Sequence, residues 1–293
     1  MSSFGSKLGY LVHHRSFQVA LVLWVVIGLA AVALCDGTMP LPIESHPDKP
    51  IAMVVSSSIA LLFLVLEIRL VGLITRRRAL PDLARRAPER SVALRETIAL
   101  WLYGALVLLV GRLVGLHYFG DSIAIHLKGS LVGATRMQSP EEVYTWAAYN
   151  GILLALIPYV VFRMRGYSNQ QLNLTSSNLK SDMTVIAVVL AIGCFIDLVL
   201  DGNFLKLTPH QQIAGGLLSF IFHFFGTGLP VMIFIYSILM PRYAKLVSPV
   251  TAFLLGAASY PAIHVFESWT RYDSPVHSTL SVIVVFLIFF PPG

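Results

Sequence analysis

The chain has 293 residues, of which 56% are apolar and only 12% are charged, and its mean hydropathy is +0.75. An ordinary soluble domain carries roughly 25% charged residues, so this composition excludes a water-soluble globular protein. Intrinsic disorder is also excluded, because it requires low hydrophobicity and high net charge. The net charge of +6 does not indicate a nucleic-acid partner, since Lys and Arg cluster at the ends of apolar segments. The composition predicts a polytopic membrane protein.

Eight apolar segments are candidates for membrane-spanning helices. About 20 apolar residues cross the hydrocarbon core, and lipid offers no partner to unpaired backbone groups, so every such segment is expected to be helical. The segments are 16–35, 51–75, 97–116, 143–162, 183–200, 213–240, 250–266 and the short 278–290. The first lacks a clear small-residue cleavage site and is interpreted as a mature helix rather than a signal peptide. The predicted fold is an all-α transmembrane bundle of about eight spans.

The positive charges predict how these helices are oriented, because cytoplasmic loops are enriched in Lys and Arg. With both termini inside, the inner segments hold 14 of them and the outer segments five. The inner ones are Lys7, Arg15, Arg76, Arg77, Arg78, Arg85, Arg86, Arg90, Arg95, Arg163, Arg165, Lys180, Arg242 and Lys245, and the outer ones are Lys49, Lys128, Arg136, Lys206 and Arg271. We therefore predict cytoplasmic N- and C-termini in a bacterial inner membrane.

Two connecting segments allow more than one interpretation. The inner loop 76–95 carries seven arginines, which anchor the topology or bind anionic lipid headgroups. The outer stretch 117–140 mixes apolar and basic residues; it lies along the membrane interface, docks a partner or simply connects two helices.

Ionisable side chains at bilayer depth are candidate functional residues, because burying each one in lipid costs about 3 kcal/mol. They are Glu67, Arg69, Arg112, Asp197, His223, His264 and Glu267. The first three lie close to a membrane face, where snorkelling or pairing accounts for them. Glu267 follows His264 by three residues on one helix face, so the pair could bind a metal, set the histidine tautomer or make a hydrogen-bonded packing contact. His223 is a candidate axial ligand for a haem or another membrane pigment.

A stretch in the sixth segment carries a family resemblance. Residues 229–242 read Leu-Pro-Val-Met-Ile-Phe-Ile-Tyr-Ser-Ile-Leu-Met-Pro-Arg. The stretch resembles the first motif helix of the CPBP family, the CAAX-prenyl and bacteriocin-processing intramembrane metalloproteases. In that motif two adjacent glutamates are followed four residues later by arginine, and then by a Leu-Leu-Pro type ending. Aligning the two prolines places Val231 and Met232 at the glutamate positions and Tyr236 at the arginine position.

Two further features extend the resemblance. The family's second motif, an aromatic residue four positions before histidine, is matched by Tyr260 and His264. The polar stretch 165–182 is similar to the region that precedes the motif helices in the family, whereas the third and fourth motifs have no counterpart up to Gly293. The resemblance therefore divides the chain into an N-terminal four-helix membrane region, 1–162, and a CPBP-like membrane region, 163–293.

The replaced motif residues determine the function that the resemblance implies. In the family a glutamate activates water beside a metal held by histidines and a glutamate. Val231 and Met232 cannot accept a proton from water, and His264 alone does not supply the three protein ligands of an ordinary catalytic zinc site. We therefore expect a catalytically inactive relative with no cofactor, which binds or stabilises another integral membrane protein as an accessory subunit. Its expected partners are membrane proteins and lipids, not nucleic acid.

An active intramembrane metalloendopeptidase remains the alternative, with zinc at His264 and Glu267 and further ligands from unmatched residues. His223 is a poor substitute for the lost glutamates, because nine residues of α-helix place it half a turn out of phase with Met232. Counting outward from the turn at Lys245 places Met232 and His264 at similar depth, so we expect them to be neighbours across two helices.

Overall fold

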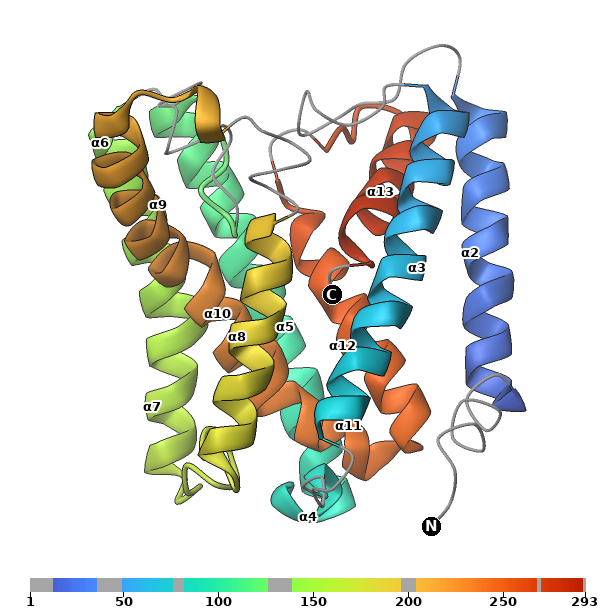
Figure 1. The fold of residues 1–293 in the computed structure, drawn as a ribbon, viewed down its shortest axis with the longest axis vertical. Coiled ribbons are helices and arrows are strands. Elements are labelled where there is room, and N and C mark those ends of the chain that lie inside the picture. Colours follow the sequence, from blue (N-terminus) through green and yellow to red (C-terminus); the bar gives the residue numbers. More distant parts are fainter. Residues whose placement is uncertain are drawn as a thin grey trace.

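The computed structural model describes residues 13–35, 49–75, 82–125, 139–195, 204–267 and 270–291. Within these ranges the secondary structure is helical and contains no β-strand, which confirms the predicted all-α class. The helices stand side by side in one bundle, with α2, α3, α12 and α13 on one side and α5 to α10 on the other (Figure 1).

Each of the eight predicted segments contains a helix. Six of the helices are α2 (Arg15–Leu34), α3 (Pro50–Ile74), α5 (Arg90–Phe119), α8 (Leu179–Phe195), α12 (Pro249–His264) and α13 (Pro275–Phe289). The fourth segment runs through α6 (Pro140–Asn150), π-helical η1 (Gly151–Leu156) and α7 (Ile157–Met164). The sixth runs through η4 (Gln211–Gly215), α9 (Gly216–His223), η5 (Phe224–Gly228), α10 (Leu229–Val231), η6 (Met232–Leu239) and α11 (Met240–Leu246), where η4, η5 and η6 are π-helical. Short turns form α4 (Leu83–Arg86) and η3 (Phe204–Lys206).

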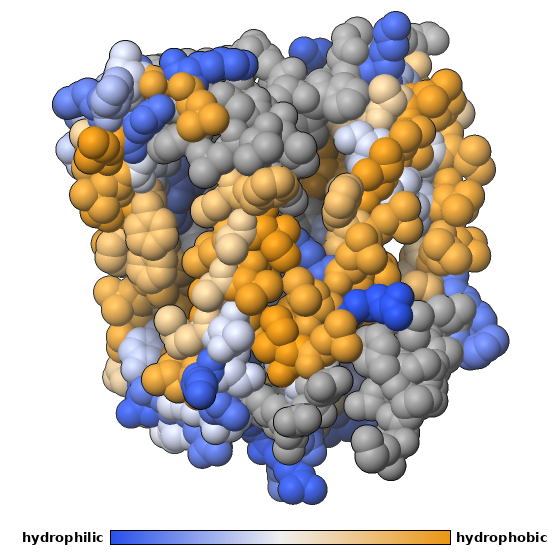
Figure 2. Space-filling model, in the orientation of Figure 1, coloured by the Kyte–Doolittle hydropathy of each residue, from blue (hydrophilic) through white to orange (hydrophobic). Residues whose placement is uncertain are grey.

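Five of these helices are long and apolar enough to cross a membrane: α2, α3, α5, Pro140–Met164 and Gln211–Leu246. The remaining three, α8, α12 and α13, have 17, 16 and 15 residues and are shorter than the typical span of about 20. Figure 2 shows apolar residues across the middle of one face and hydrophilic residues at its two ends. Asp197, the arginines 76–78 and most of the stretch 117–140 lie outside the described residues.

Three helices begin at the same local signal, a serine followed by proline: Ser139–Pro140, Ser248–Pro249 and Ser274–Pro275. In each, the serine hydroxyl accepts a hydrogen bond from a backbone N–H of the first turn. Proline fits the first helical position because the N–H that it lacks would be unpaired there. α5 ends at Gly120, whose φ of 72° lies in the left-handed region that glycine tolerates.

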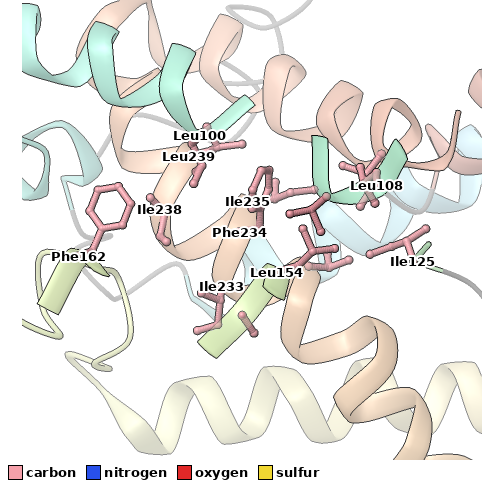
Figure 3. Close-up of a cluster of buried hydrophobic side chains, with 14 of the residues drawn as sticks. Leu100, Leu108, Ile125, Leu154, Phe162, Ile233, Phe234, Ile235, Ile238 and Leu239 are labelled. Carbon is pink, nitrogen blue, oxygen red and sulfur yellow. The ribbon is translucent and has the colours of Figure 1, made fainter. Parts of the chain in front are cut away.

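The main core forms where η6 packs against α5 and the η1–α7 segment. Figure 3 shows Leu100 and Leu108 converging with Leu154, Ile235 and Leu239 from these elements. A second cluster joins α2, α3 and α13. The main core includes residues from both sides of position 163, so the predicted division of the chain at that position rests on the resemblance alone.

One end of the bundle, called the α4 end below, contains α4 and the first residues of α2, α5 and α12 (bottom of Figure 1). Arg90 at the start of α5 donates to the carbonyl of Leu246 just before α12, and Ser16 near the start of α2 is hydrogen-bonded to Thr251 of α12.

Candidate functional site

His264 is the last residue of α12 and is fully buried. Its Nδ1 lies 2.7 Å from the carbonyl oxygen of Tyr260. A carbonyl oxygen can only accept, so Nδ1 carries a hydrogen. Nε2 lies 3.8 Å from the Oε1 atom of Glu267, which is also buried. The ring stacks on Phe289 of α13, with 3.9 Å between centroids. The structure therefore brings His264 and Glu267 together inside the protein.

Arg112 of α5 holds the turn that follows α12. Its guanidinium donates to the carbonyl of Glu267, to the Thr270 hydroxyl at 2.8 Å and to the Thr270 carbonyl at 2.9 Å. The Thr270 hydroxyl in turn donates to the carbonyl of Val265 at 3.0 Å. Because carbonyl oxygens of a turn have no helix partner, these bonds fix the backbone that carries Glu267. Arg112 is thus engaged inside the bundle.

The motif positions of the sixth segment face different environments. Val231 is buried in the main core, whereas Met232 is 52% exposed. Tyr236 is partly buried against the same core, and its carbonyl accepts a hydrogen bond from Asn173 at 3.2 Å. The His264 ring contacts Tyr260 and Phe289, and the expectation that Met232 lies beside His264 stays a prediction. Met232 begins a π-helical stretch, whose wider turns change the direction that α-helical counting assigns to a side chain.

His223 ends α9 in a partly buried position. Its Nδ1 lies 2.9 Å from the carbonyl of Ser219, one turn earlier, so this nitrogen donates within its own helix. The ring meets Trp146 of α6 edge-on, with 5.4 Å between centroids. His223 therefore packs at the contact between two helices, away from the His264 cluster.

A buried ion pair that sequence reasoning missed joins α5 to α11. Glu96 is 3% exposed and Arg242 is fully buried. Nε of Arg242 donates to Oε2 of Glu96 at 2.8 Å, Nη2 lies 2.6 Å from the same oxygen, and Nη1 donates to the Ile238 carbonyl at 2.8 Å. Glu96 directly precedes the predicted segment 97–116 and Arg242 closely follows 213–240. The sequence signal that could have predicted this ion pair is the presence of opposite charges next to the ends of two predicted helices.

The polar turn after α7 completes this network. Nη2 of Arg165 lies 2.9 Å from Oε1 of Glu96, and the Tyr167 hydroxyl donates to the same oxygen at 2.8 Å. Burial raises the pKa of Tyr167, and its hydrogen bond to Glu96 acts in the same direction, so the phenol stays protonated and donates at neutral pH. The Arg242 guanidinium also lies 4.4 Å from the centre of the Phe162 ring. Two arginines and one glutamate thus tie three segments together at the α4 end.

A second missed feature is a re-entrant loop, residues 120–125, which turns back into the bundle after α5. Its residues Ile123, Ala124 and Ile125 are buried, and the Ile123 N–H donates to the carbonyl of Gly111 at 3.4 Å. A Cβ atom on Gly115 would lie 2.4 Å from the carbonyl oxygen of Asp121, so only glycine allows this approach. These residues therefore fold against α5, and they are the only part of the predicted interfacial, docking or connecting stretch after Phe119 and before Ser139 that the structure describes.

Side chains from two helices satisfy the backbone of the re-entrant loop. Asn150, fully buried at the end of α6, donates to the carbonyl of Ile123 at 2.9 Å and accepts from the N–H of Ile125 at 3.2 Å. The Ile125 carbonyl accepts from Trp146 at 3.1 Å and from Thr227 at 2.7 Å. Irregular backbone that is buried away from water requires such partners, because its N–H and C=O groups would otherwise stay unpaired.

The small number of grouped metal-ligating side chains limits the chemistry that the described residues permit. Over the described ranges, no three His, Cys, Asp or Glu side chains are grouped so that they could hold a metal ion. His264 and Glu267 together provide two donors, fewer than an ordinary catalytic zinc site requires. No protein-family model, no curated protein and no solved structure matches this chain. The resemblance to the CPBP family therefore rests on the motif residues quoted above.

Proposed function

We propose that this chain is an integral membrane protein that binds and stabilises another membrane protein as an accessory subunit. Its frame is CPBP-like and lacks the hydrolytic groups of that family. It crosses a bacterial inner membrane about eight times, with both termini in the cytoplasm. The five long apolar helices and the excess of Lys and Arg in alternate loops support this topology.

The main support for this proposal is the environment of the two positions at which the CPBP family has glutamates. Activation of water requires a carboxylate that can accept its proton beside a metal. Val231 is apolar and buried in the main core, and Met232 points away from that core at the surface. Neither side chain can serve as the base. The buried charges Glu96 and Arg242 join α5 to α11.

α8 offers the face on which a partner helix would bind. It packs against α3, and none of its residues is buried. Small side chains at helical spacing, Thr184, Ala187 and Ala191, form a shallow open groove on one face of α8, which Lys180, Met183 and Val188 also line. In lipid, helices associate where small residues allow close backbone approach. We place an apolar transmembrane helix of the partner protein in this groove.

Site-specific photocrosslinking in native membranes tests this arrangement. A photoreactive amino acid at Ala187 is expected to give one discrete protein adduct, because this position faces the groove. The same group at Ile186, which is 49% exposed and points about 100° around α8 from Ala187, is the matched control and should label lipid. A191F, which fills the groove, should abolish the adduct and lower the abundance of the partner protein in the membrane. Equal labelling from both positions, or an adduct insensitive to A191F, contradicts the proposal.

One observation favours the alternative, an intramembrane metalloendopeptidase. The hydrogen bond from Nδ1 of His264 to the Tyr260 carbonyl leaves Nε2 directed toward Glu267, which is the tautomer that metal-binding histidines use. Under the accessory-subunit proposal, the purified chain supplied with zinc cleaves no membrane peptide. Cleavage that disappears in H264A, with the fold retained by circular dichroism, would establish the protease instead.

A further inference from the structure

The first half of α2 borders a groove that it shares with α12 and the end of α13. These three helices lie in the right-hand half of Figure 1. Its volume of about 420 Å³ falls within the range of small-molecule sites. The walls are mainly apolar and include Val19, Leu23, Trp24, Ala258 and Phe290. Because α2 is apolar and largely exposed along this length, the groove opens toward the space that lipid occupies.

The end of α13 sets the depth of the groove. Beyond Trp24, residues such as Ile27 and Ala31 of α2 pack against α13 and α3 in the second core cluster. Phe290, which follows α13, lies against Trp24 with 5.9 Å between ring centroids. The lining of α2 therefore runs from Arg15 at the α4 end to Ile27. The 12 rises of helix between these two residues cover about 18 Å, close to the roughly 15 Å of hydrocarbon in one leaflet.

The α4 end of the groove is polar. Arg15 and Ser16 lie there, and the Ser16 hydroxyl is 2.8 Å from that of Thr251, which in turn is 2.8 Å from the hydroxyl of Ser248. Both α2 and α12 begin at this point, so the partly positive ends of two helices face it. Arg15 is exposed and, within the described part of the chain, pairs with no carboxylate. The apolar groove, which is about as long as one leaflet is thick, thus ends at the exposed guanidinium of Arg15.

We propose that this groove binds an anionic glycerophospholipid, with one acyl chain between α2 and α12 and the phosphate at Arg15. The charge complementarity selects an anionic headgroup, because a basic residue at the membrane surface attracts acidic lipids. The apolar wall is about as long as one leaflet is thick, so it fits one acyl chain of the leaflet whose headgroups lie at the α4 end. Arg15 is the headgroup-binding residue, and Trp24 and Phe290 contact the end of the chain.

Native mass spectrometry of the full chain in mild detergent tests the proposal with two lipids of identical acyl chains, phosphatidylglycerol and phosphatidylcholine. The wild-type chain is expected to bind phosphatidylglycerol more tightly. R15Q should weaken phosphatidylglycerol binding about fivefold, the effect of one surface charge, and should weaken phosphatidylcholine binding less, because the choline cation offsets the charge of the phosphate that both lipids carry. A258F, which fills the groove, should weaken both lipids. L21F adds the same ring on another face of α2 and should change neither.

A second measurement does not depend on the folding of A258F. Phosphatidylglycerol brominated on its acyl chain should quench the fluorescence of Trp24, obtained as the difference between the wild-type chain and W24F. Unbrominated lipid at the same concentration is the control. Equal affinity for the two headgroups, no change in R15Q, or no quenching of Trp24 overturns the proposal.

Discussion

Replacing Glu96 with glutamine is expected to lower the free energy of unfolding by about 3–5 kcal/mol, because it leaves a buried charge without its counter-ion. Glutamine keeps the shape of the side chain and removes the charge that faces Arg242. The guanidinium of Arg242 is fully buried and cannot turn toward water. Arg165 contacts the same carboxylate but its side chain is 51% exposed, so it can reorient. Reversible unfolding by sodium dodecyl sulfate in mixed micelles, followed by circular dichroism, measures the loss.

Two controls separate this effect from a general loss of charge. R85Q removes an ion pair with Asp82 whose side chains are 87% and 55% exposed, and it should change the free energy of unfolding by less than about 1 kcal/mol. The double variant E96L/R242M replaces the buried pair with apolar side chains and should recover most of the stability that E96Q loses. If E96Q and R85Q lose the same amount, the Glu96 network does not anchor the α4 end.

The helices could be predicted from the sequence because hydropathy reports directly which segments contact lipid. The predicted segment 143–162 corresponds to the continuous helix 140–164. The prediction was less accurate for α5, which was expected at 97–116 and extends over Arg90–Phe119. Hydropathy ends a segment at the first charged residues, whereas backbone hydrogen bonds continue through Arg95 and Glu96. The side chain of Glu96 is sheltered by Arg242, a partner that lies 146 positions away in the chain.

The site was harder to predict because the sequence does not show which way side chains point in irregular helices. Two π-helical stretches, Phe224–Gly228 and Met232–Leu239, lie in the segment that carries the motif resemblance. Counting at 100° per residue therefore fails between His223 and Met232. The re-entrant loop had one usable signal: Gly111 and Gly115 are four residues apart on α5, a spacing that allows close backbone approach. Its partner Asn150 was not singled out, because only ionisable side chains were taken as candidates at bilayer depth and an amide is uncharged.

Replacing Asn150 with leucine is expected to lower the free energy of unfolding by about 2–6 kcal/mol. Leucine has a similar size but leaves the Ile123 carbonyl and the Ile125 N–H unpaired, and each buried unpaired group costs about 1–3 kcal/mol. Hydrogen exchange read by mass spectrometry should show faster exchange of the loop amides in N150L, and unfolding in mixed micelles should give the energy.

Thr227→Val is the matched control for Asn150→Leu, because both remove a polar side chain that holds the same loop. The Ile125 carbonyl loses the Thr227 donor but keeps the indole N–H of Trp146 at 3.1 Å, so no backbone group is left unpaired. T227V should therefore cost about 1 kcal/mol and leave exchange at Ile125 unchanged. Equal effects of the two variants would mean that burial of Ile123 and Ile125, and not the amide of Asn150, holds the loop in the bundle. A larger effect of N150L identifies the amide as the group that allows irregular backbone at this depth.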